Sequence, residues 1–130
     1  MTRARRNVAK AFRQTVAVVS IALALTAAVS RAQAPIPVMI LDGESAGPYH
    51  DWARVTPVLK KMLDETGLFA TTVVTAPPAG GDFAAFVPAF TKYRAVVLNY
   101  DAPDDRWPAA LKSSFERYVR EGGGLVVVHA

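Results

Sequence analysis

The stretch Gly122-Gly-Gly-Leu-Val-Val-Val-His-Ala130 decides the fold of this chain. Its glycines end the preceding element, and the apolar residues after them are typical of a parallel strand that is buried on both faces. In such sheets ligands bind beyond the carboxyl ends of the strands. His129 directly follows the apolar run. We therefore predict that a buried strand brings one imidazole to a site.

The segments upstream alternate between strand and helix patterns. β-branched and apolar residues between turn signals predict three strands, at residues 36–41, 69–75 and 94–100. Apolar residues at helical spacing predict a helix that ends before Gly67 and another from Pro108 to the glycines at 122. A short helix is expected after Asp82. The first helix begins either at Asp51 or at Thr56-Pro57, and the sequence leaves this open.

This order of elements, without any two-residue hairpin turn, predicts a doubly wound, mainly parallel α/β sheet. The flavodoxin-like arrangement of such sheets has the first strand in the centre and the fourth strand inside the sheet. Only His129 and Ala130 follow the fourth strand here, and an uncovered valine-rich strand promotes aggregation. We therefore expect residues 33–130 to be the N-terminal part of a C-terminally truncated domain.

The first 32 residues have the layout of a secretory signal peptide. They carry six of the fifteen basic residues and no acid, followed by an apolar run at residues 16–29 and small residues around Ala32. A run of 14 residues is shorter than the roughly 20 that a permanent membrane span needs. We expect contact with the membrane only during export to the periplasm or the medium, with an uncleaved anchor as the alternative.

The charges and motifs of the remaining residues exclude several classes of partner. Nine basic and eleven acidic residues remain, without a basic stripe, which disfavours nucleic acid. The chain has no cysteine, so it offers no thiol nucleophile and no thiolate metal ligand. The glycines at 80–81 and 122–124 lack the context of a phosphate-binding loop, so no nucleotide cofactor is expected.

Polar residues follow the predicted strands, and the carboxyl ends of parallel strands meet at one edge of a sheet. Both histidines of the chain, His50 and His129, fall at this edge. We predict that they and Asp101 are catalytic, with an imidazole as general base oriented by a carboxylate such as Asp101 or Asp51. Alternatively, His50 and His129 bind a divalent metal such as zinc, with one position open for water or substrate. The expected substrate-binding residues are Asp42, Gly43, Asp51, Trp52 and Asn99.

Each of these residues also has a simpler structural interpretation. Asp42-Gly43 is most often only a turn, and Asp51 only a helix cap. Asp101 fits a solvated loop together with the acids at 104 and 105. A histidine after a buried strand can be a satisfied core residue, and Trp52 either packs at a helix start or stacks on a sugar ring. These alternatives stay open at this point.

Several short motifs in one order resemble a known family. They are Val38-Met-Ile-Leu-Asp-Gly43, His50-Asp-Trp-Ala-Arg-Val-Thr-Pro57, Tyr93-Arg-Ala-Val-Val-Leu-Asn-Tyr100 and the closing Gly122–Ala130 stretch. Residues 36–130 resemble the trehalose-utilisation (ThuA-like) family, whose members are similar in fold to class I glutamine amidotransferases. Domains of this kind continue well beyond the point at which this sequence stops.

The resemblance implies a role in carbohydrate metabolism, with a small-molecule carbohydrate as partner. If the protein is an enzyme, a hydrolase- or lyase-like activity on a sugar or glycoside derivative is expected. His129 stands where the amidotransferases carry their nucleophilic cysteine, so a cysteine-dependent glutaminase is not implied. The alternative is a non-catalytic carbohydrate- or protein-binding module of the same fold. Neither the reaction nor the oligomeric state follows from the sequence.

Overall fold

The computed structural model describes residues 33–45 and 50–128. The chain divides into two units after Gln33, and the fold is that of the second unit, Ala34–Ala130. Its elements are β1 (Ile36–Asp42), α2 (Trp52–Asp64), β2 (Phe69–Thr75), the 3-10 turn η1 (Phe90–Lys92), β3 (Ala95–Leu98), α3 (Ala109–Arg120) and β4 (Gly124–Val127). The predicted signal peptide and His129 lie outside the described residues. Within them, no helix is both long enough and apolar enough to cross a membrane.

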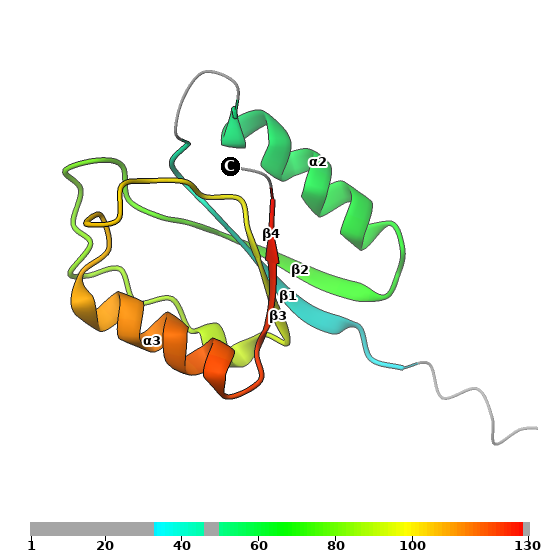
Figure 1. Cartoon of the computed structure of the whole chain (residues 1–130). Helices are drawn as coiled ribbons and strands as arrows, with labels where there is room; N and C mark the ends of the chain where they lie inside the picture. The colour runs from blue at the N-terminus through cyan, green and yellow to red at the C-terminus, as the bar shows by residue number, and fades with distance from the viewer. Residues whose placement is uncertain (1–32, 46–49, 129–130) are drawn as a thin grey trace, which may run out of the picture. The chain divides into compact units, whose positions relative to one another are not determined.

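The four strands of the described residues form one parallel sheet in the order β2-β1-β3-β4. β1 lies in the centre, with Ile40 opposite Val73 of β2 on one side and opposite Val97 of β3 on the other. Helices α2 and α3 cover opposite faces of this sheet (Figure 1). The predicted doubly wound α/β fold with flavodoxin-like strand order is therefore confirmed.

The two faces of β1 hold separate apolar cores, because successive side chains of a strand point to opposite sides of the sheet. Met39 and Leu41 share a buried cluster with Tyr118 of α3, whereas Ile40 lies in a second cluster with Leu63 of α2. By the same alternation Asp42, the last residue of β1, lies on the α2 face. The strand thus fixes which helix each polar residue at its end can meet.

The structure decides where α2 begins. Asp51 is its N-cap, and the Asp51 carboxylate accepts a hydrogen bond from the backbone N–H of Arg54 at 3.3 Å. Pro57 lies inside the helix, where proline removes one helical hydrogen bond. Of the apolar side chains predicted to lie on one side of α2, Val58 and Met62 are 55% and 62% exposed. The sheet buries a narrower stripe of the helix than the apolar pattern indicated.

The helix predicted after Asp82 is not formed. The Asp82 carboxylate accepts hydrogen bonds from the N–H groups of Ala84 and Ala85, but the chain then continues without helical structure to η1. Glycines before Asp82 and a proline at position 88 leave too few residues for a stable helix. Phe90 is nevertheless buried in the α3-side core, so this segment contributes through its aromatic side chains instead.

β4 differs from the buried strand that its sequence predicts. It pairs with β3 on one side and lies at the edge of the described sheet. Leu125, Val126 and Val127 are 40%, 54% and 59% exposed, because the described residues place no further strand or helix over them. An apolar run thus indicates the strand correctly, but it does not reveal what covers the strand.

Gly43 ends β1 in a conformation that requires glycine. Its φ is +128°, and a Cβ atom at this position would lie 2.5 Å from the backbone oxygen of Ala76. The close approach follows from a strand-end hydrogen bond, in which the Ala76 N–H donates to the Asp42 carbonyl at 2.7 Å. Gly43 therefore lets the ends of β1 and β2 pack directly against each other.

We predict that Gly43→Ala destabilises the protein by more than the roughly 1–3 kcal/mol that backbone strain alone costs. Gly67→Ala is the matched control, because Gly67 also has a positive φ of +67° but has no atom within 4 Å of the added Cβ. That change should cost only about 1–2 kcal/mol. Denaturant unfolding of the full-length protein measures both changes, and equal losses would refute the packing argument.

Candidate functional site

The candidate site lies where β1 and β3 end, at the carboxyl edge of the sheet. α2 leaves the sheet on one side and α3 on the other, so ligands of this fold are expected between these strand ends. A small hollow opens there, and we name it the strand-end hollow. It is lined by Glu44, Ser45, His50, Asn99, Tyr100, Asp101 and Val128. Its volume of about 10 Å³ has room for roughly one water-sized group.

Three of the predicted site residues, His50, Asn99 and Asp101, meet in the strand-end hollow. They come from two loops that are far apart in the sequence, one after β1 and one after β3. The backbone holds these loops together, because the Asp101 N–H donates to the Glu44 carbonyl at 3.1 Å. His129 lies outside the described residues, although Val128, the residue before it in the sequence, lines the hollow.

Asn99 is fixed by two hydrogen bonds. Its backbone N–H donates to the Leu41 carbonyl at 2.9 Å, which continues the β1–β3 pairing for one residue beyond β3. Its side-chain Nδ2 donates to the hydroxyl of Thr56 at 3.0 Å, and Thr56 is a buried residue of α2. With the amide nitrogen bound to Thr56, the amide oxygen is left to accept a bond from another group.

Asp42 is the most buried of the predicted site residues, with 1% of its surface exposed. It does not line the strand-end hollow. Within the described part of the chain its Oδ1 has no hydrogen-bond partner. A buried carboxylate oxygen without a partner is costly, and such groups in native proteins usually have a reason. Asp42 is also the last residue of β1, so it belongs to the strand and not only to the turn that its sequence position allowed.

Asp51 and Trp52 lie at the start of α2 and not in the lining of the hollow. Asp51 is exposed and acts as the helix cap described above, which is the simpler of the two roles that its sequence position allows. The backbone N–H of Trp52 donates to the Ser45 hydroxyl at 3.3 Å. This contact connects the helix start to a residue that does line the hollow.

Glu44 and Arg106 form an ion pair that the sequence did not reveal. Two hydrogen bonds join them, from Arg106 Nε to Glu44 Oε2 at 2.8 Å and from Arg106 Nη2 to Glu44 Oε1 at 2.7 Å. The side chains are only 20% and 23% exposed. The hydrogen bond from Glu44 raises the pKa of the Arg106 guanidinium, and the hydroxyl of Tyr100 donates to Glu44 Oε2 at 3.5 Å. The pair therefore joins the loop after β1 to the loop after β3.

The pair was missed for a physical reason. Glu44 and Arg106 are 62 positions apart, and no local spacing links them. Only the adjacency of β1 and β3 in the sheet brings their loops together. The sequence held only an indirect indication of this pair. Glu44 is a charged residue shortly after a central strand, at the edge of the sheet where neighbouring loops converge.

The described residues do not make up a metal site. Within residues 33–45 and 50–128, no three histidine, cysteine or acidic side chains lie close enough together to hold a metal ion. The zinc hypothesis needs His129 in addition to His50, so it stays a prediction.

No family model matches the chain, and no curated protein matches it. A crystal structure of a protein from Parabacteroides merdae, described as ThuA-like, superposes on this chain with a TM-score of 0.65 and 36% identity. The superposition covers 74% of this chain.

The chain belongs to the ThuA-like family. This confirms the resemblance drawn from the short motifs, and the strand order of this chain is consistent with the amidotransferase-like superfamily. The match covers 33% of the Parabacteroides protein, so the chain spans about a third of the length of this family member.

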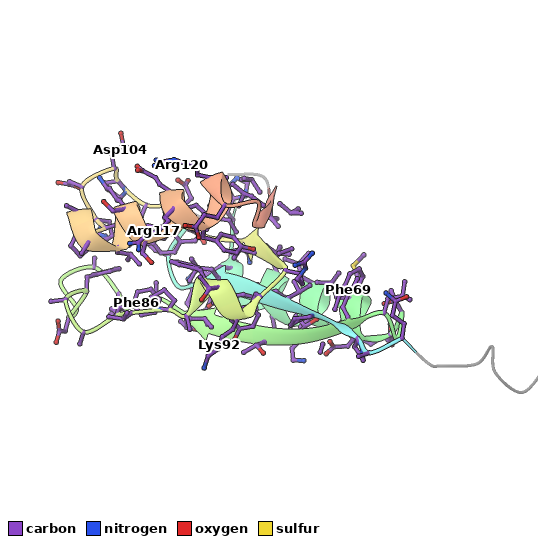
Figure 2. All side chains as sticks on the ribbon, turned by 90° about the horizontal axis from the view of Figure 1, so that it is seen from below. Phe69, Phe86, Lys92, Asp104, Arg117 and Arg120 are labelled. Atoms are coloured by element: carbon purple, nitrogen blue, oxygen red, sulfur yellow. The ribbon has the colours of Figure 1, made fainter. Side chains whose placement is uncertain are left out.

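We predict that Arg106→Ala lowers the free energy of unfolding by about 1–3 kcal/mol, because it leaves the half-buried Glu44 carboxylate without its charged partner. Arg120→Ala is the matched control. Arg120 pairs with Glu116 at 4.0 Å on the outer side of α3, where both side chains are more than 60% exposed (Figure 2). Its loss should cost less than about 0.5 kcal/mol. Equal effects in denaturant unfolding would contradict a stabilising role for the Glu44–Arg106 pair.

Proposed function

We propose that this ThuA-like protein is exported and acts on a sugar or glycoside derivative at the strand-end hollow. The observation that supports this most is the meeting of His50, Asn99 and Asp101 at the carboxyl edge of the sheet. The ThuA-like family membership supports a role in carbohydrate metabolism, as its trehalose-utilisation name suggests. Export rests on the signal-peptide pattern of residues 1–32, which lie outside the described residues.

The polar groups of the strand-end hollow suit a neutral ligand that donates hydrogen bonds. The Asn99 amide oxygen is left to accept, and the carboxylates of Asp101 and Glu44 accept only. Among the described residues no lysine or arginine lines the hollow, and the nearby Arg106 is paired with Glu44. Sugar hydroxyls donate to such acceptors, whereas a phosphate or carboxylate group would be repelled.

The reactive group of the proposal is an imidazole. Histidine gains and loses a proton near neutral pH, so it can remove a proton from a hydroxyl, from water or from a carbon next to a carbonyl. His50 is half-buried and lines the same hollow as Asp101. We assign proton transfer to His50 and His129, with Asp101 as the supporting carboxylate. Hydrolase- or lyase-like chemistry is consistent with these roles.

The proposal is tested by measuring turnover of glycosides and their oxidised derivatives by the full-length protein and its variants. We expect His50→Ala and His129→Ala each to lower kcat by about 10²–10⁴-fold, the usual contribution of general acid–base catalysis. Arg117→Ala, on the exposed surface of α3, serves as the control and should leave kcat unchanged (Figure 2). Zinc content is measured on the same samples.

Two results would overturn the enzyme proposal. One is wild-type protein that binds a glycoside without converting it, with the same affinity in both histidine variants. This would favour the non-catalytic binding module. The other is turnover that persists in both variants, which would place the chemistry on different residues.

A further inference from the structure

A second hollow adjoins the strand-end hollow and is much larger. It lies between the loop after β3 and the first half of α3, and its volume is about 230 Å³. We name it the aromatic pocket, after the rings of Tyr100, Trp107 and Phe115 that line it. Pockets for drug-sized molecules measure roughly 300–1,000 Å³. The aromatic pocket therefore suits a smaller ligand, about the size of a single ring.

The three rings form a continuous apolar wall. The centroids of Tyr100 and Trp107 are 5.7 Å apart with an interplanar angle of 33°, and those of Trp107 and Phe115 are 5.6 Å apart at 89°. All three side chains are only half-buried, so part of each ring is open to a ligand. Burial raises the pKa of the Tyr100 hydroxyl further above neutral pH, and this hydroxyl donates a hydrogen bond to Glu44 Oε2 at 3.5 Å.

Charged groups of both signs complete the aromatic pocket. Asp101 and Asp104 supply carboxylates, and Lys112 of α3 supplies an ammonium group. Within the described residues neither Asp104 nor Lys112 takes part in an ion pair or a side-chain hydrogen bond, and Asp104 is exposed on the loop before α3 (Figure 2). Two hydrogen-bond acceptors, Asp101 and Asp104, and one donor, Lys112, thus lie beside the aromatic rings.

The two hollows share residues, which makes them parts of one surface. Tyr100 and Asp101 line both. The strand-end hollow has room for roughly one hydroxyl or water. A substrate that places one reacting group there needs an adjoining surface for the rest of the molecule, and the aromatic pocket provides it.

We propose that the aromatic pocket is the subsite for the sugar ring of the substrate, with Trp107 as the stacking platform. A pyranose has an apolar C–H face, which fits an aromatic ring, and a rim of hydroxyls, which both donate and accept hydrogen bonds. Asp101 and Asp104 accept from these hydroxyls, and Lys112 donates to them. This inference rests on the proposed function, because it names the binding surface for the same substrate.

The composition of the pocket favours a sugar over a cationic ligand. Aromatic rings beside two carboxylates also attract quaternary ammonium groups. Lys112, however, places a positive charge in the same lining and offsets part of this attraction. A neutral sugar ring contacts the aromatic rings, the carboxylates and the lysine ammonium, and none of these groups repels it.

The test is saturation-transfer NMR on the full-length protein, with methyl α-glucopyranoside as the probe and choline as the cationic comparison. We expect the glycoside to bind, with the strongest transfer to the ring C–H protons that face Trp107. Trp107→Ala should weaken binding by about tenfold, which corresponds to a loss of about 1.4 kcal/mol. Asp104→Asn and Lys112→Met should each weaken it about three- to tenfold.

Matched controls separate the pocket from general effects of charge. Asp105→Asn changes the neighbouring exposed acid, which does not line the pocket, and Lys92→Met changes an exposed lysine on η1 (Figure 2). Neither should alter binding. Asp104 and Lys112 are exposed, so their variants keep the test decisive even if Trp107→Ala unfolds.

Three results would overturn the subsite. These are unchanged glycoside binding in the Asp104 and Lys112 variants, choline binding in preference to the glycoside, and no glycoside binding to the wild type. The proposed function fails separately, through the histidine variants. If His50→Ala abolishes turnover while the pocket variants bind and react like wild type, the proposed function stands and the subsite does not.

Discussion

The structure depends on the burial of one strand. Met39, Ile40 and Leu41 of β1 are completely buried, and each such side chain contributes about 1.5–3 kcal/mol when it leaves water. β1 is paired on both edges and covered on both faces, so β2, β3, α2 and α3 all pack around it. The positions of the polar residues after β1 and β3 follow from this arrangement, because the two strands end at the same edge of the sheet.

Much of the fold was predictable from the sequence, since strands such as residues 69–75 consist of apolar and β-branched residues between clear turn signals. Central placement of β1 and the parallel order also followed from the alternation of elements. The helix expected after Asp82 is not formed, because the helix propensity of this segment is weak. The burial of Phe90 determines the position of the segment instead. The exposure of Val126 and Val58 could not be predicted, because an apolar pattern does not specify which neighbours cover it.

The candidate site was predictable only in part. Positions after parallel strands correctly grouped His50, Asn99 and Asp101, because strand ends meet whatever the loops contain. The Glu44–Arg106 pair and the edge-to-face contact of Trp107 with Phe115 could not be predicted, since each depends on two loops or elements meeting in three dimensions. For Asp51, in contrast, the sequence left open even a local interaction. The hydrogen bond from the Arg54 N–H shows its role as a helix cap, which was one of two interpretations, and its role in substrate binding stays a prediction.

Gly43 has a consequence for the site as well as for the strands. On one side of it the Asp42 carbonyl binds the Ala76 N–H near β2, and on the other side the Glu44 carbonyl binds the Asp101 N–H beyond β3. Within two residues the chain therefore changes neighbours, from one edge of β1 to the other. This change of direction is possible because Gly43 carries a hydrogen where every other residue carries a carbon. The position of Glu44 beside the loop after β3 thus depends on the absence of a Cβ atom at Gly43.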